Sequence, residues 1–223
     1  MKTFIVYAHP EPTSFNAALK DRAVETLTSA GHEVAVTDLY ADGFDVGHAG
    51  RRDFKEVADP ARFDYQVEQK HATDTGSFDD LLAREQDRLY WCDLLIFQFP
   101  LWWFGVPSIL KSWIDRVLAY GKTYDLGHRY ETGMLQGRRA MVCLTTGGPE
   151  RRFGGDGGQY KDIGVYMQPI EFGVFEYMGF EVEKRFVAWS APRVTDEERH
   201  EMLDAWAERL REVAGAGVIR KSA

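Results

Sequence analysis

The sequence predicts an α/β fold in which a five-stranded parallel sheet carries helices on both faces. Five short apolar runs have the composition of buried strands: residues 3–8, 33–38, 94–99, 139–146 and 180–188. Segments with helical spacing separate most of these runs, as expected for right-handed crossovers between parallel strands. Because no repeat or linker interrupts the alternation, we expect a single domain over residues 1–223.

The first strand, residues 3–8, is a continuous apolar run that His9 and Pro10 end. Thr13 and Ser14 then offer hydroxyl groups that can cap a helix beginning at Phe15. After the second strand, residues 39–77 are rich in Gly, Asp, Pro and Arg and show no periodicity. We expect a long loop there, either an insertion or a functional surface.

The rest of the chain continues the alternation of strands and helices. Its spacing predicts helices over residues 81–90, 109–118, 166–178 and 196–213. Pro169 would lie near the first turn of the third of these helices. Thr195, followed by acidic residues, is typical of a capped helix start.

Composition and charge exclude several classes of protein. The net charge of −8 without a basic stripe argues against a nucleic-acid partner. No apolar run approaches the roughly 20 residues of a membrane span, and the N-terminus lacks a signal-peptide pattern. Cys92 and Cys143 are far apart and the histidines are scattered, so the pattern favours a reduced cytoplasmic protein with no metal site.

An aromatic row, Trp102, Trp103 and Phe104, follows the third strand between Pro100 and Pro107. Taken alone, the row fits a loop that caps the core, a dimer patch, or a wall for a flat aromatic ligand. Open parallel sheets bind ligands beyond the carboxyl ends of their strands. Since other unusual residues also follow the first and fourth strands, the position favours a ligand wall.

The segment after the first strand can bind a phosphate at a helix N-terminus, although it lacks the Gly-x-Gly-x-x-Gly pattern of dinucleotide sites. Thr13 and Ser14 would add hydroxyl groups, Asn16 an amide and His9 a positive charge. Each also has a structural reading, because Thr13 and Ser14 can be simple caps and His9 can merely leave the strand.

The fourth strand runs into Thr145-Thr-Gly-Gly148, where two residues without side chains let backbone N–H groups approach a ligand. A flavin needs such donors, because its reduction builds negative charge on one edge of the ring. The aromatic row would shield one ring face and offer further N–H groups.

These motifs resemble the NAD(P)H quinone oxidoreductases of the DT-diaphorase type, which have a flavodoxin-like fold. The resemblance rests on Ala8-His9 with Thr13-Ser-Phe-Asn16, on Phe97-Gln-Phe-Pro-Leu101 with Trp103-Phe-Gly-Val-Pro107, and on Thr145-Thr-Gly-Gly148. Similar spacing continues to the C-terminal helix, so the resemblance covers nearly the whole chain.

The resemblance implies a homodimer with its active site at the subunit interface, FAD as cofactor, and a ping-pong cycle. NAD(P)H would pass a hydride to flavin N5, and a quinone-like acceptor would then take it from the same face. The cofactor-binding residues would be His9, Thr13, Ser14, Phe15, Asn16, Pro100, Leu101, Trp102, Trp103, Phe104, Thr145, Thr146, Gly147, Gly148 and Arg199. Tyr124 corresponds to a tyrosine of the family's substrate pocket, often supplied by the partner subunit.

The sequence departs from the family where a tyrosine and a histidine are expected after the Gly-Gly pair. Phe153 and Tyr160 stand there, and both would line the substrate pocket. Tyr160 can donate a neutral hydrogen bond but cannot carry a histidine's positive charge. We expect Tyr160 with the N–H groups of Gly147 and Gly148 to stabilise the reduced flavin, in a slower cycle. The glycine-rich loop 154–158 is either a mobile lid or a plain surface loop.

Two other functions remain open on the sequence. One is a flavin-binding regulatory subunit of a potassium-efflux system, with which the altered position of Tyr160 is compatible. The other is a one-electron flavodoxin carrier, which His9-Pro-Glu-Pro12 does not favour. FAD is expected over FMN because of Thr13–Asn16 and Arg199. The choice between NADH and NADPH cannot be read from these motifs.

Overall fold

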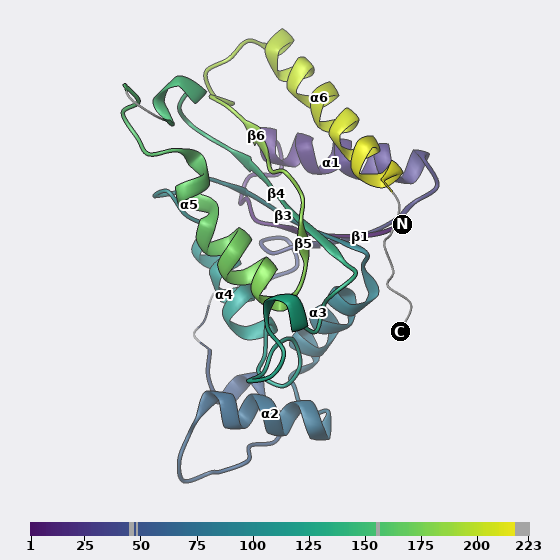
Figure 1. Cartoon of the computed structure of the whole chain (residues 1–223), viewed down its shortest axis with the longest axis vertical. Coiled ribbons are helices and arrows are strands. Elements are labelled where there is room, and N and C mark those ends of the chain that lie inside the picture. The colour runs from purple at the N-terminus through teal and green to yellow at the C-terminus, as the bar shows by residue number, and fades with distance from the viewer. Residues whose placement is uncertain (45–46, 48, 155–156, 217–223) are drawn as a thin grey trace.

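The computed structural model describes residues 1–44, 47, 49–154 and 157–216. A central parallel sheet has the strand order β2-β1-β3-β4-β5, and β6 also pairs with β4 (Figure 1). Its strands are β1 (Lys2–Tyr7), β2 (Glu33–Asp38), β3 (Leu94–Pro100), β4 (Arg139–Thr145), β5 (Glu181–Val182) and β6 (Phe186–Ala188). The predicted doubly wound parallel sheet is therefore confirmed.

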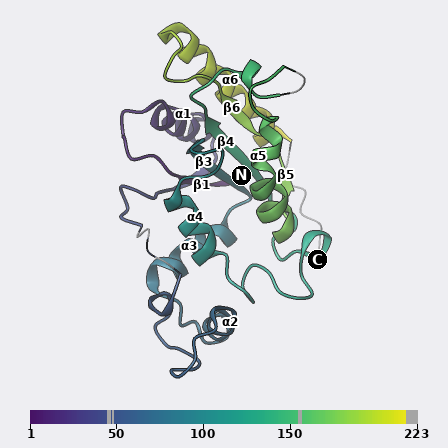
Figure 2. The same cartoon turned by 90° about the vertical axis from the view of Figure 1, so that its left-hand side faces the viewer.

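Helices cover both faces of the sheet, as Figures 1 and 2 show. On one face lie α1 (Phe15–Ser29) and α6 (Asp196–Gly215), whose packing buries Trp206 completely. On the other lie α3 (Asp80–Trp91), α4 (Ser108–Val117) and α5 (Ile163–Ile170), with Trp113 in the core. Each face of the sheet thus has its own apolar core.

The predicted fifth strand is divided into β5 and β6 by a bulge. Val182 pairs with Ala140 and Phe186 with Cys143, so four residue steps on this strand oppose three on β4. One extra residue breaks the ladder and reverses the alternation of side chains. Between the two pieces, Glu183 pairs with Arg139 (3.2 Å) and Arg209 (2.8 Å).

The prediction of a long loop over residues 39–77 was wrong, because helix α2 (Tyr65–Thr75) lies within it. Asp64 caps its first turn by accepting from the N–H groups of Gln66 and Val67, and Gly76 ends it with a φ of 72°. In Figure 1, α2 lies at the far end of the molecule from α1 and α6.

Buried polar contacts help to hold this segment in place, in addition to the apolar contacts of Phe54 and Phe78. The buried carboxylate of Glu68 accepts from the N–H of Ala58 (2.6 Å). Asp53, also buried, accepts from Arg116 Nε (2.8 Å) and from the hydroxyl of Tyr65 (2.9 Å). Because these buried residues are polar, the hydrophobic periodicity that usually marks a helix is missing here.

The helix predicted over 166–178 begins earlier, at Ile163, where Asp162 caps it. Pro169 lies inside α5 rather than near its first turn. Its missing N–H leaves the carbonyl of Val165 without the usual helical donor. The chain continues after Ile170 as a π-helical segment, Glu171–Glu176, so the helix widens two residues beyond the proline.

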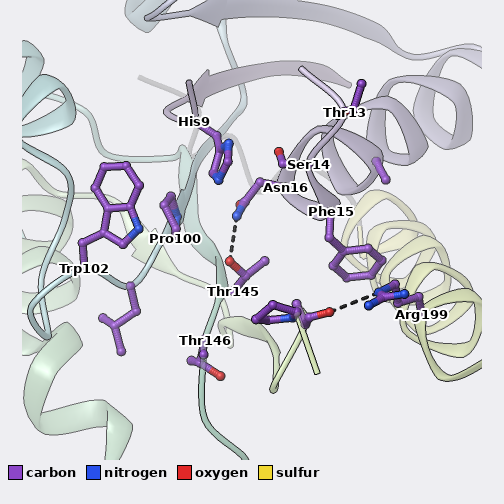
Figure 3. Close-up of a pocket in the computed structure, with 15 residues that line it drawn as sticks. His9, Thr13, Ser14, Phe15, Asn16, Pro100, Trp102, Thr145, Thr146 and Arg199 are labelled. Atoms are coloured by element: carbon purple, nitrogen blue, oxygen red, sulfur yellow. Dashed lines mark hydrogen bonds between the residues drawn. The ribbon is translucent and has the colours of Figure 1, made fainter. Parts of the chain in front are cut away.

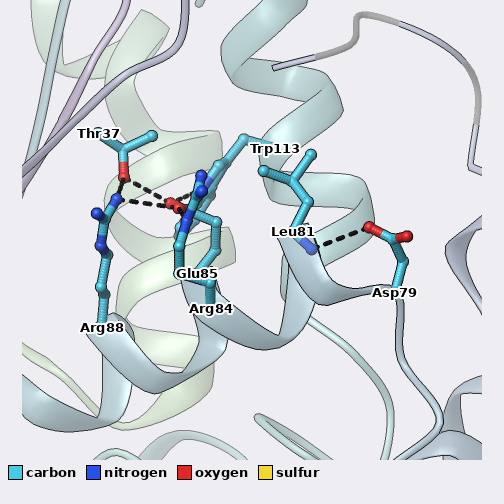
Figure 4. Close-up of polar contacts among 7 residues, drawn as sticks. All are labelled: Thr37, Asp79, Leu81, Arg84, Glu85, Arg88 and Trp113. Atoms are coloured by element: carbon cyan, nitrogen blue, oxygen red, sulfur yellow. Dashed lines mark hydrogen bonds and ion pairs between the residues drawn. The ribbon is translucent and has the colours of Figure 1, made fainter. Parts of the chain in front are cut away.

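A buried carboxylate joins β2, α3 and α4 (Figure 4). Glu85 is 0% exposed, and its Oε2 accepts from Thr37 Oγ1 (2.7 Å) and Trp113 Nε1 (3.0 Å). Its Oε1 accepts from Arg88 (3.1 Å) and Arg84 (3.2 Å). Such a fully bonded carboxylate specifies how these three elements pack.

Candidate functional site

A cavity of about 660 Å³ lies at the carboxyl ends of β1, β3 and β4 (Figure 3). It lies where β1 has β2 on one side and β3 on the other, which is the topological switch point of the sheet. Its lining comes from the segments after these strands, the start of α1, the chain before α6 and α6 itself: His9, Thr13, Ser14, Phe15, Asn16, Ala18, Pro100, Leu101, Trp102, Thr145, Thr146, Gly147, Ala191, Pro192 and Arg199.

The N-terminus of α1 forms one end of this cavity. Ser14 Oγ accepts from the N–H of Ala17 (3.1 Å), so the predicted cap is confirmed. The first-turn N–H groups of Phe15 and Asn16 have no intrahelical acceptor and suit an anion. The Thr13 hydroxyl is bonded to Glu11 Oε1 (2.7 Å), an interaction that also lowers the pKa of Glu11.

In the ligand-free protein, His9 is not expected to carry the positive charge that its sequence position suggested. Burial lowers its pKa below the ordinary histidine value, and the neutral ring is therefore favoured at pH 7. Nδ1 lies 3.1 Å from the N–H of Glu11 and accepts from it. This contact assigns the ring proton to Nε2, which leaves a neutral donor for a ligand.

Asn16 carries an unsatisfied polar atom at the cavity. Its side chain is buried, and Nδ2 donates to Thr145 Oγ1 (2.7 Å). Gln98 Nε2 holds the backbone carbonyl of the same residue (2.5 Å). Among the described residues the Asn16 Oδ1 acceptor has no partner, and such an orphaned group costs about 1–3 kcal/mol. A ligand that brings an N–H or O–H donor to this position would remove that cost.

A second cavity of about 280 Å³ adjoins the first and shares Leu101, Thr146 and Gly147 with it. Its remaining lining residues are Trp103, Phe104, Gly148, Arg152, Phe153, Tyr160 and Arg193. The Thr146 hydroxyl donates to the Gly148 carbonyl (2.7 Å) and fixes the turn. Within the described part of the chain, the N–H groups of Gly147 and Gly148 find no protein acceptor.

The aromatic row forms a tight turn, closed by hydrogen bonds between the backbones of Trp102 and Gly105 (3.2 and 3.0 Å). Trp103 (φ 51°) and Phe104 (φ 59°) are both left-handed, a conformation that bulky residues rarely adopt. Trp103 is 97% exposed, whereas Phe104 stacks on Tyr166 (4.6 Å) and contacts Tyr160 (5.1 Å). Strain of this kind is typical of ligand sites.

Replacing Trp103 with glycine is expected to leave the free energy of unfolding unchanged or to raise it by up to about 1 kcal/mol. The reason is that glycine relieves the left-handed strain while the exposed indole contributes little burial. Urea unfolding without added ligand measures this. A loss above about 1 kcal/mol would show that the indole has a structural role.

Tyr124 does not join the two cavities described above. It lines a third cavity of about 300 Å³ with Tyr65, Ile114 and Tyr177, and its ring packs on that of Tyr177 (5.6 Å). That cavity shares no lining residue with the other two. Its predicted role in substrate binding therefore stays a prediction that needs a second subunit.

The structure groups the other expected residues and adds some that the sequence did not reveal. Phe153 and Tyr160 pair at the base of the glycine-rich loop, with ring centroids 5.1 Å apart. The centre of that loop, residues 155–156, lies outside the described residues. Whether the loop is a lid therefore stays a hypothesis. The residues missed are Ala18, Arg152, Ala191, Pro192 and Arg193. In the sequence, the only signal that the segment after β6 belongs to the site is that it follows the end of a strand.

Within residues 1–44, 47, 49–154 and 157–216, no group of three or more His, Cys, Asp or Glu side chains could hold a metal ion. Over the same residues, no helix has the length and apolar character needed to span a bilayer.

Comparison with known proteins identifies relatives along nearly the whole chain. A family model described as a flavodoxin-like fold matches residues 1–210. The chain is 39% identical over 213 residues to ribosyldihydronicotinamide dehydrogenase [quinone] of Mus musculus, covering 95% of this chain and 91% of the relative. It is 37% identical over 212 residues to NAD(P)H dehydrogenase [quinone] 1 of Rattus norvegicus, covering 95% and 77% respectively.

A solved structure from Klebsiella pneumoniae, to which quinone reductase activity is provisionally assigned, superposes with a TM-score of 0.88. It is 36% identical in sequence, and the match covers 96% of this chain and 85% of that one.

Proposed function

The chain belongs to the NAD(P)H quinone oxidoreductase family of flavodoxin-like fold, and from that premise we propose that it is an FAD-dependent NAD(P)H:quinone oxidoreductase. The observation that carries the proposal is the pair of joined cavities with backbone donors at Gly147 and Gly148 that have no acceptor among the described residues. When bound, a flavin would supply a two-electron carrier between NAD(P)H and the quinone.

The larger cavity suits the cofactor. The N–H groups of Phe15 and Asn16, with His9 Nε2, would bind the diphosphate, and Asn16 Oδ1 would accept from the ligand. Where the two cavities join, residues 100–104 and 145–148 would hold the isoalloxazine between the aromatic turn and the backbone donors.

FAD is favoured over FMN by the length of this cavity, which continues past the start of α1 to Arg199 on α6. Figure 3 shows Phe15 and Arg199 at the same end. Arg199 Nε donates to the carbonyl of Ala191 (3.1 Å), and NH1 pairs with Asp196 (2.5 Å). These contacts fix the guanidinium where the adenine end of FAD would lie.

The smaller cavity suits the substrates. Phe153, Phe104 and Tyr160 would cover a nicotinamide or quinone ring, and the N–H groups of Gly147 and Gly148 would stabilise developing negative charge. Because this cavity is a single small space, donor and acceptor would occupy it in turn. That order of binding is the one a ping-pong cycle requires.

We also propose that the protein works as a homodimer in the cytoplasm. Trp103, Leu126 and Val67 are large apolar side chains that the single chain leaves exposed. In a dimer, Tyr124 of each subunit would reach the other subunit's substrate site. The free and buried state of Cys92 and Cys143 is compatible with a reducing compartment. Analytical ultracentrifugation measures the assembly.

The affinity for FAD is expected to rise as the pH falls from 8 to 5.5. The diphosphate would stabilise the protonated form of His9 and raise its pKa, which burial depresses in the free protein. Affinity therefore increases as pH falls through the pKa of the complex and levels off below the pKa of the free protein. Fluorescence titration with FAD measures this. The FAD affinity of the His9→Asn variant should not depend on pH in this way. An unchanged pH dependence in that variant would contradict the proposed role of His9.

The decisive test of the proposed function has two parts. Heating the purified protein should release FAD, identified by mass, whereas FMN or no flavin would contradict the proposal. Steady-state oxidation of NADPH with menadione should then exceed the background rate. Turnover at background with FAD bound would instead support the regulatory role in potassium efflux.

A further inference from the structure

Two arginines stand at the rim of the smaller cavity, beside the Gly147-Gly148 turn. Arg152 ends a short 3₁₀ turn, Glu150–Arg152, and its Cδ lies 3.7 Å from where a Cβ of Gly148 would be. Arg193 precedes α6 and donates through NH1 to the carbonyl of Gly147. The two side chains thus reach the same turn from segments about 40 residues apart in the sequence.

Neither arginine has a carboxylate partner among the described residues. Both residues are exposed. Elsewhere in this acidic protein, Arg185, Arg199 and Arg209 each pair with a carboxylate. Two guanidinium groups that form no ion pair with a described carboxylate attract an anion beside a cavity, and their planar geometry suits phosphate.

The size of the cavity indicates which part of a ligand they would meet. Its volume of about 280 Å³ is at the lower end for a small-molecule site, enough for one ring system. A dinucleotide that placed its nicotinamide ring under Phe104 and Tyr160 would have to extend its phosphates past the rim. Arg152 and Arg193 lie at that rim.

We propose that Arg152 and Arg193 bind the phosphates of the reduced nicotinamide co-substrate. They would make this protein select NADPH or NADH over a phosphate-free donor such as the ribosyldihydronicotinamide in the name of the mouse relative. This inference rests on the proposed oxidoreductase function. It adds a specificity determinant that neither the aromatic turn nor the Gly-Gly pair supplies.

The test uses the flavin-loaded protein and its Arg152→Ala, Arg193→Ala and double variants, with NADPH, NADH and N-ribosyldihydronicotinamide as donors and menadione as acceptor. Each single replacement should raise the KM for NADPH about tenfold, the size of one lost charge-assisted hydrogen bond. In the double variant, the KM for NADPH should rise by up to about a hundredfold. The kcat/KM with the phosphate-free donor should not change.

Arg151→Ala is the matched control, because it removes the same charge from the adjacent, exposed residue that does not line the cavity. Its KM for NADPH should equal that of the parent protein. In the Arg152 and Arg193 variants, a larger rise in KM for NADPH than for NADH would assign the contact to the 2′-phosphate. Equal rises would assign it to the diphosphate.

Three results would overturn the inference. The first is an unchanged KM for NADPH in the double variant. The second is an equal loss of kcat/KM with the phosphate-free donor, and the third is a parent protein that prefers the phosphate-free donor. The second would mean that Arg193 only supports the Gly147 turn. Calorimetric titration with NADP⁺ separates this inference from the proposed function. If no donor reduces the protein, the proposed oxidoreductase function is wrong. Weaker NADP⁺ binding by the double variant would still support phosphate binding by Arg152 and Arg193.

Discussion

Replacing Tyr160 with phenylalanine is expected to slow reduction of the bound flavin by NADPH about 10²–10³-fold, the cost of losing one donor at a developing anion. The ring should stay in place, because it packs on Phe104 and Phe153 through contacts that do not involve the hydroxyl. Only the oxygen is removed from the cavity that Gly147 and Gly148 also line. Stopped-flow absorbance of the flavin measures the step directly.

Tyr166→Phe is the control for this experiment. Tyr166 belongs to the same ring cluster and stacks on Phe104, but its hydroxyl accepts from the N–H of Lys161 (3.1 Å) and lines neither cavity. Its removal should leave flavin reduction unchanged. An equal rate in Tyr160→Phe and the parent protein would show that the Gly147 and Gly148 donors suffice without the phenol.

Replacing Glu85 with alanine is expected to lower the free energy of unfolding by about 3–5 kcal/mol. The variant leaves the Trp113 indole N–H, the Thr37 hydroxyl and the Arg88 guanidinium without their shared buried acceptor. At roughly 2–4 °C per kcal/mol for a chain of this size, Tm should fall by about 10 °C. Calorimetry and urea unfolding measure the change.

Arg84→Ala is the matched control for Glu85. Arg84 contacts the same carboxylate at 3.2 Å, but its side chain is 47% exposed. Its loss should cost less than about 1 kcal/mol, as for other solvent-exposed pairs. If Glu85→Ala costs no more than Arg84→Ala, the buried carboxylate does not determine how β2, α3 and α4 pack.

Much of the site could be predicted because parallel strands end at one edge of a sheet. The segments His9–Asn16, Pro100–Phe104 and Thr145–Gly148 each follow an apolar strand, and the structure brings all three to two joined cavities. Their separation along the sequence did not matter, since strand order alone placed them together.

What the sequence could not reveal depends on contacts between distant polar groups. Helix α2 was missed because its buried positions include Glu68 and Gln69 rather than an apolar stripe. Asp64 and Gly76 were the local signals available for it. Arg152 and Arg193 were missed as site residues because their significance comes from a shared cavity rather than from a motif.

The larger cavity is built from the beginning and the end of the chain, since its walls include the start of α1 and Arg199 of α6. These two helices also pack together, and Trp206 Nε1 donates to the carbonyl of Leu19 (3.0 Å). A cofactor that binds only the closed arrangement would lower the population of molecules in which α6 has detached. By this linkage, cellular flavin supply would govern how long the protein survives proteolysis as well as how fast it turns over.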